Sequence, residues 1–113
     1  MVSTINHLSA TTLIGDDITN PQNENLGDLK DIMIDTSSGK ISYGVVSYGG
    51  ILGMGDKLFA VPWSAFTIDH ENKSLVLNVS KDRLKDAPGF DKSNWPNFAD
   101  STYASTLNTY YVR

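Results

Sequence analysis

The chain contains no cysteine, and this absence excludes several kinds of chemistry at once. Disulfide bonds, cysteine-ligated zinc, iron–sulfur clusters and thiol catalysis all require that residue. Signal-peptide features are also missing, because residues 1–10 contain no Lys or Arg and no continuous apolar run. No other stretch approaches the roughly 18 apolar residues that a membrane helix needs. We therefore expect a soluble protein without a membrane span, and the absence of cysteine favours the cytoplasm.

Basic clusters and convergent titratable groups are missing too. The nine Lys and Arg residues form no run and are outnumbered by thirteen Asp and Glu residues, for a net charge of −4. Nucleic acid is therefore not an expected partner. The two histidines, His7 and His70, lie far apart, and the aspartates occur where turns and solvated strand faces explain them, without the spacing of a calcium loop. We expect no catalytic site, no bound metal and no cofactor.

Turn signals, by contrast, are frequent. With 113 residues, of which 40% are hydrophobic, the chain can form one core but not two. Between residues 13 and 79 the turn signals recur every eight to twelve residues. They are Gly15–Asp17, Asn20–Asn23, Asp35–Gly39, Gly49–Gly50, Pro62 and Glu71–Asn72. This spacing predicts a mainly β fold, either a sandwich or a small barrel of short strands.

The pattern of apolar residues places three of these strands. Residues 73–79 alternate between an apolar and a mostly polar face, and residues 66–70 are the expected partner across the turn at residues 71–72. Residues 40–48 have apolar side chains on both faces, with Gly44 between them. That pattern predicts a central strand that is covered on both sides.

Residues 25–35 fit both a helical and a strand spacing. Gly27 in the interior would cost a helix about 1 kcal/mol relative to Ala. The turn-rich segment from Asp35 to Gly39 is typical of a hairpin connection. We therefore predict a strand with a β-bulge near residues 29–32, followed by a hairpin in which Gly39 takes a left-handed conformation.

The composition changes after residue 79. Ser80 is placed to cap a short helix over residues 81–87, which Pro88 and Gly89 would stop. Six of the eleven aromatic residues follow residue 89, and this density predicts a folded segment. A helix beginning at Asp100 or Ser101 would carry an apolar stripe of Tyr103, Leu107 and Tyr110 or Tyr111. We predict a domain over residues 11–87 and a C-terminal extension over residues 88–113, packed on that domain or on a second copy.

A glycine-rich segment occupies residues 49–57. Residues 55–57, Gly-Asp-Lys, precede a strand-like run, whereas a phosphate-binding loop needs Gly-Lys-Ser/Thr at the start of a helix. The segment is therefore predicted to be a flexible loop between two strands. The apolar residues at its tip, Ile51, Leu52 and Met54, either fold back onto the core or offer a surface to a partner.

The segment Pro62–Phe66 predicts a tight corner. Pro62 ends a strand, and Trp63 and Phe66 are three residues apart, so both rings can lie on one side of a single turn. The interpretation is a corner of the sheet filled by aromatic rings. A binding role for Trp63 is the alternative.

The order of these motifs resembles the PRC-barrel family, over about residues 11–85. The matching segments are Leu13–Gly15, Asn25–Gly27, Asp31–Asp35, Gly39, Asp56–Trp63 and Leu75–Leu77. The family includes the cytoplasmic domain of the photosynthetic reaction centre H subunit and a domain of a ribosome maturation factor. This chain resembles the short stand-alone bacterial members, and we expect it to have neither the membrane anchor of the first nor the N-terminal domain of the second. The resemblance implies a small, strongly bent β-barrel of about six strands, without an active site, on which other proteins dock.

The sequence and the resemblance together predict a non-enzymatic protein-interaction or scaffold module, with a homodimer as the expected assembly. A small-ligand binder is the alternative, with an aromatic-lined cavity between the barrel and the C-terminal extension that uses Trp63, Trp95 or Tyr110. The candidate protein-interaction residues are Ile51, Leu52, Met54, Trp63, Trp95 and Tyr110.

Overall fold

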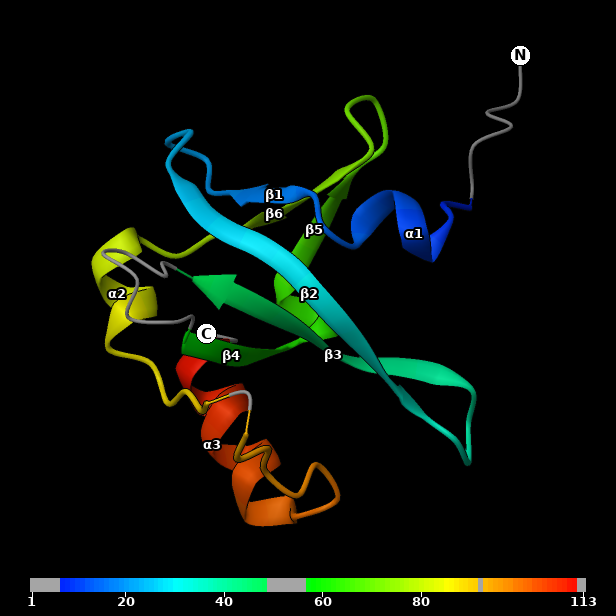
Figure 1. Cartoon of the computed structure of the whole chain (residues 1–113), viewed down its shortest axis with the longest axis vertical. Helices are drawn as coiled ribbons and strands as arrows, with labels where there is room; N and C mark the ends of the chain where they lie inside the picture. Colours follow the sequence, from blue (N-terminus) through cyan, green and yellow to red (C-terminus); the bar gives the residue numbers. More distant parts are fainter. Residues whose placement is uncertain (1–6, 49–56, 92, 112–113) are drawn as a thin grey trace.

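The computed structural model describes residues 7–48, 57–91 and 93–111. Six strands form a single sheet, and short helices lie around it (Figure 1). The strands are β1 (Asp17–Thr19), β2 (Asn25–Asp35), β3 (Lys40–Tyr48), β4 (Lys57–Pro62), β5 (Phe66–Asp69) and β6 (Ser74–Leu77). The helices are α1 (Ala10–Leu13), the 3-10 turn η2 (Trp63–Ala65), α2 (Lys81–Lys85) and α3 (Ser101–Tyr111). The predicted mainly β fold with six strands is confirmed.

The strand order across the sheet is β4-β3-β2-β1-β6-β5. Neighbouring strands are antiparallel except β1 and β6, which are parallel, with Ile18 opposite Leu75. The edge strands β4 and β5 are consecutive in the chain and are joined only through η2. No ladder between them is found within the described residues, so the sheet is open and the closed, strongly bent barrel stays a prediction.

The segment that fitted both a helix and a strand, residues 25–35, forms strand β2, as predicted. Its pairing with β3 shifts register between Leu29 and Asp31, which confirms the bulge. Gly27 has a φ of 111°, and a Cβ there would collide with the Ser47 carbonyl oxygen. Gly39 has a φ of 77°, and its N–H donates to the Asp35 carbonyl at 2.7 Å. The predicted left-handed hairpin turn is therefore confirmed.

The positions of the other strands are also confirmed, but the strand predicted over residues 73–79 is shorter and spans Ser74–Leu77. β3 lies between β2 and β4, so both of its edges are paired. Both of its faces are also covered in the middle of the strand, because the consecutive residues Val45 and Val46 are fully buried. β5 and β6 pair as an antiparallel hairpin across the predicted turn. At the corner, the rings of Trp63 and Phe66 lie 5.5 Å apart at η2.

The helix after the sheet begins as predicted and ends earlier. The Ser80 hydroxyl accepts a hydrogen bond from the Arg83 N–H at 3.1 Å and caps α2. The helix ends at Lys85 and not at Ala87, because the Ala87 N–H already bonds the Leu84 carbonyl in a tighter turn that leads into Pro88.

The C-terminal segment packs on the sheet of its own chain. Phe90 forms a bridge to Leu58 at the β4 edge, with backbone hydrogen bonds of 2.9 and 2.8 Å. α3 then packs against β4 and buries Leu107 and Tyr111 in the core (Figure 1). The predicted helix and its apolar stripe are confirmed, and the Asp100 carboxylate accepts from the Thr102 N–H at its start.

Candidate functional site

The structure separates the predicted interaction residues. Ile51, Leu52 and Met54 lie outside the described residues, and the alternatives for them stay open. Trp63 is half-buried at η2, and its ring packs against the core and against Phe66. It therefore contributes to the corner of the sheet. Trp95 and Tyr110 lie at two different surface sites, which are described in turn.

Trp95 lies at the edge of an aromatic cluster outside the sheet. Its ring lies 5.1 Å from Phe90 and 6.2 Å from Phe98, and 39% of the residue remains exposed. Phe98 connects this cluster to the sheet, because its ring lies 5.4 Å from Tyr43 of β3. The cluster therefore holds Phe98 against β3 and Phe90 against β4.

A cleft of about 370 Å³ adjoins this cluster. It separates the end of the β2–β3 hairpin from residues 98–99, and Ile34 on its rim is 58% exposed. Ile34 and Trp95 are two of the three large apolar side chains that are exposed in the described part of the chain. The cleft is lined by Met33, Ile34, Asp35, Thr36, Ser42, Tyr43, Phe98 and Ala99. The lining combines apolar side chains with the polar side chains of Asp35, Thr36 and Ser42.

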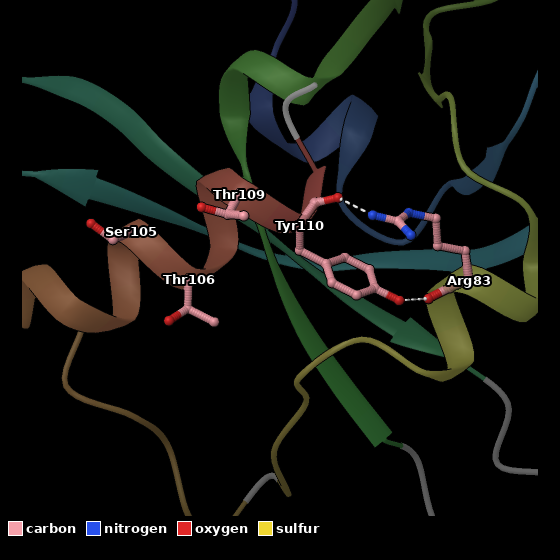
Figure 2. A pocket seen from close by; sticks show the side chains of 5 residues that line it. All are labelled: Arg83, Ser105, Thr106, Thr109 and Tyr110. Atoms are coloured by element: carbon pink, nitrogen blue, oxygen red, sulfur yellow. Dashed lines mark hydrogen bonds between the residues drawn. The ribbon is translucent and has the colours of Figure 1, made fainter.

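Tyr110 lines a second, larger groove of about 600 Å³ between α2 and α3 (Figure 2). The Arg83 guanidinium lies over the Tyr110 ring, 4.2 Å from its centroid, and donates to the Tyr110 carbonyl at 2.7 Å. In return, the Tyr110 hydroxyl donates to the Arg83 carbonyl. These contacts tie the C-terminal end of α3 to α2, where a cation is favourable next to the helix carbonyls.

The chemistry of this groove is limited to hydrogen bonding and one positive charge. Ser105, Thr106 and Thr109 supply hydroxyls from α3, and the Thr106 hydroxyl donates to the Thr102 carbonyl. The positive charge of Arg83 disfavours a cationic ligand in this groove. The described residues that line the groove include neither Trp63 nor Trp95, so the three predicted aromatic residues do not form one cavity.

The inner side of α3 contains unpaired polar atoms. Within the described part of the chain, the hydroxyls of Tyr103 and Tyr111 are buried without a hydrogen-bond partner. Burial raises the pKa of both hydroxyls, and most strongly that of Tyr111. An unpaired buried hydroxyl costs about 1–3 kcal/mol, so these groups weaken the docking of α3.

The exposed acids of the turns have local partners. Hydrogen bonds from the Ser37 side chain and backbone lower the pKa of Asp35, and hydrogen bonds from Asn72 lower the pKa of Asp69. These carboxylates stabilise turns, as the sequence predicted for the aspartates. His70 is exposed just after the end of β5. No group of three or more metal-ligating side chains is found among residues 7–48, 57–91 and 93–111.

Asn20 is a buried polar residue whose role sequence reasoning missed. Its amide donates to Glu24 Oε1 at 2.7 Å and to the Val79 carbonyl at 2.9 Å, and its Oδ1 accepts from two backbone N–H groups of the following turn. The residue therefore joins the β1–β2 turn to the end of the sheet and has a structural role. Arg83 was missed as well, because its partner Tyr110 lies on a distant segment. Ile34 was missed because its exposure depends on where the neighbouring strands end.

The comparisons with known proteins agree with this architecture. The family model described as the PRC-barrel domain matches residues 5–84. The match ends within α2, so α3 lies beyond it. A search of curated proteins finds no match. In the described residues, no helix is long and apolar enough to cross a membrane.

Proposed function

The chain belongs to the PRC-barrel family, and on that premise we propose that it is a non-enzymatic module that binds other proteins. A single observation carries this proposal. Ile34 is exposed on the rim of the 370 Å³ cleft, and Trp95 is exposed at the edge of the aromatic cluster whose Phe98 lines that cleft. Exposed apolar side chains around a concave surface are typical of protein-interaction sites.

The absence of convergent catalytic groups supports the non-enzymatic part of the proposal. Among the described residues, the two surface sites contain one arginine, one aspartate and several hydroxyls, but no acid–base pair. The proposal also includes a cytoplasmic location, a closed barrel and a homodimer, which rest on the sequence and the family resemblance.

Retrieval of partners from the native cells tests the proposed function. The tagged chain is crosslinked in its own cells and its partners are identified by mass spectrometry. We expect Ile34→Asp to lose a partner that the wild-type chain retrieves, because the aspartate places a charge on the rim of the cleft. Ile14→Asp is the matched control, since Ile14 is also an exposed isoleucine and does not line the cleft.

Both variants should melt at the wild-type temperature, since both side chains are exposed. A wild-type chain that retrieves no specific protein contradicts the proposed function. Equal retrieval by the wild type and by Ile34→Asp would place the interaction on another surface.

A second candidate function is the binding of a small molecule in the groove at Tyr110. The observation that favours it is the pair of an aromatic ring and a cation beside three hydroxyls. A screen of small anionic and neutral compounds by ligand-observed NMR tests it, with Arg83→Met as the variant expected to lose anionic hits. This candidate fails if no compound binds the wild-type chain more tightly than it binds the variant.

A further inference from the structure

The β2–β3 hairpin extends beyond the rest of the sheet as a hairpin arm, residues 30–42 (Figure 1). β1 pairs with β2 only as far as Asp28, and the last backbone bonds on that side join Leu29 to Gly15 and Asp16. Beyond this point, within the described residues, only β3 pairs with β2. The outer edge of β2 from residue 30 to residue 35 is therefore open to another strand.

The peptide groups of Ile32 and Ile34 face this open edge. The Asp35 carbonyl accepts from Gly39 inside the hairpin, so the backbone of Asp35 faces β3. The register shift between residues 33 and 34 adds its extra residue to β3, and alternation along β2 therefore remains regular. A separate contact agrees with this orientation, because the Ile32 N–H donates to its neighbour's carboxylate, Asp31 Oδ1, at 2.8 Å.

The two faces of the same segment differ in chemistry. Asp31, Met33 and Asp35 share one face, while Ile32 and Ile34 share the other, since successive side chains of a strand alternate. A strand added to this edge would thus lie beside carboxylates on one face and beside isoleucines on the other. Cross-strand pairs of opposite charge and of apolar groups stabilise such an addition.

We propose that the edge of β2 at Ile32–Ile34 binds an extended segment of a partner protein in which basic and apolar side chains alternate. The backbone of that segment pairs with the outward N–H and C=O groups of Ile32 and Ile34. Its Lys or Arg side chains lie beside Asp31 and Asp35, and its apolar side chains lie beside the isoleucines. The proposal rests on the proposed function and names the partner segment and its site.

The charge of the edge favours such a partner over a second copy of this chain. An antiparallel pair of two β2 edges would place the carboxylates of both copies on the same face, where like charges are destabilising. Lys40 lies opposite Asp35, but it belongs to β3, on the side away from the open edge. Of residues 30–35, Lys30 is the only cation and Asp31 and Asp35 are the anions, so a basic segment meets an edge of net negative charge.

Asp31 gives the edge a means of selecting a basic segment. Its carboxylate occupies the Ile32 N–H in the free chain, so an incoming carbonyl must replace it. A Lys or Arg on the partner can bind the displaced carboxylate, whereas a neutral or acidic strand leaves it without a new partner. Charged side chains at sheet edges commonly prevent unwanted strand pairing in this way.

A synthetic peptide tests the proposal directly. The probe is a capped hexapeptide of alternating lysine and valine, titrated into the full isotope-labelled chain and followed by amide NMR shifts. We expect saturable shifts at residues 30–35. Ile34→Pro removes an outward N–H without touching the β3 ladder, as edge strands tolerate, and should weaken binding about tenfold. Ile34→Ala is the matched control, because it keeps that N–H and should retain most of the affinity.

A second variant keeps the test informative if Ile34→Pro does not fold. Asp31→Asn retains an acceptor for the Ile32 N–H but removes the charge, so it should abolish the preference for the lysine peptide over a threonine–valine peptide. Shifts that fall outside residues 30–35, or equal losses for Ile34→Pro and Ile34→Ala, overturn the proposal. If a partner retrieved from cells binds the Ile34→Pro variant as well as it binds the wild type, the proposed site is wrong. The proposed function would still hold in that case.

Discussion

The sheet and the C-terminal segment of this chain are stabilised in different ways. The sheet is held by backbone ladders and an apolar core, and its buried Asn20 has hydrogen bonds at both ends of its amide. α3, by contrast, buries two hydroxyls without partners and is tied at its end by Arg83 and Tyr110. Backbone pairing thus fixes the sheet, whereas a few side chains hold the helix.

The free energies of the helix interface nearly balance. Full burial of Leu107 and Tyr111 contributes about 1.5–3 kcal/mol each, and the two unpaired hydroxyls cost about 1–3 kcal/mol each. The reciprocal contact between Arg83 and Tyr110 therefore matters for docking. We expect α3 to open more readily than the sheet unfolds.

The largest effect is expected in the sheet, at Gly27. Gly27→Ala places a side chain at positive φ and against the Ser47 carbonyl, which should cost about 3 kcal/mol or more of unfolding free energy. Gly39→Ala is the matched control, because its φ is also positive but the space around it is open, and it should cost about 1 kcal/mol. Urea denaturation measures both, and equal losses would contradict the close approach of β2 and β3.

The next effect separates the helix from the sheet. Leu107→Ala should cost about 2–3 kcal/mol, with the loss appearing first as faster hydrogen exchange in α3. The amides of β2 and β3 should then exchange faster only through global unfolding. Simultaneous and equal loss of protection in α3 and the sheet would show that the two regions unfold as one unit.

Two adjacent tyrosines should respond with opposite signs. Tyr110→Phe removes the hydroxyl that donates to the Arg83 carbonyl, and should lower the unfolding free energy by about 1 kcal/mol. Tyr111→Phe removes a buried hydroxyl without a partner, and should leave stability unchanged or raise it by about 1 kcal/mol. Thermal denaturation of the two variants measures the difference, and a destabilised Tyr111→Phe would indicate a bound water or another partner for that hydroxyl.

The smallest effect at neutral pH concerns the same hydroxyls. Burial raises the pKa of Tyr103 and Tyr111 in the folded chain, so the folded state favours their neutral form. Their contribution to stability is full below the unfolded pKa of about 10 and is lost as the pH rises above it. Urea midpoints measured from pH 8 to pH 11 should fall at the alkaline end, and fall less for Tyr111→Phe.

The sequence predicts the sheet better than it predicts the surface sites. The bounds of β2 and β3, the bulge near Leu29 and the turn at Gly39 follow from local patterns of apolar residues and glycine. The contact of Arg83 with Tyr110 does not, since those residues are distant in sequence and their pairing depends on how α3 docks. Ile34 is similar, because its exposure follows from where β1 and β4 stop and not from its own neighbours in the chain.

The parallel pairing of β1 with β6 has a consequence for how the protein folds. It brings Ile18 beside Leu75, so two neighbouring strands of the sheet join the two ends of the strand-bearing region. β2 and β3 can pair as a local hairpin as soon as they leave the ribosome, whereas β1 must wait until residue 77 has been synthesised for its second neighbour. Since long-range pairings slow folding, we expect the docking of β6 onto β1 to limit the folding rate.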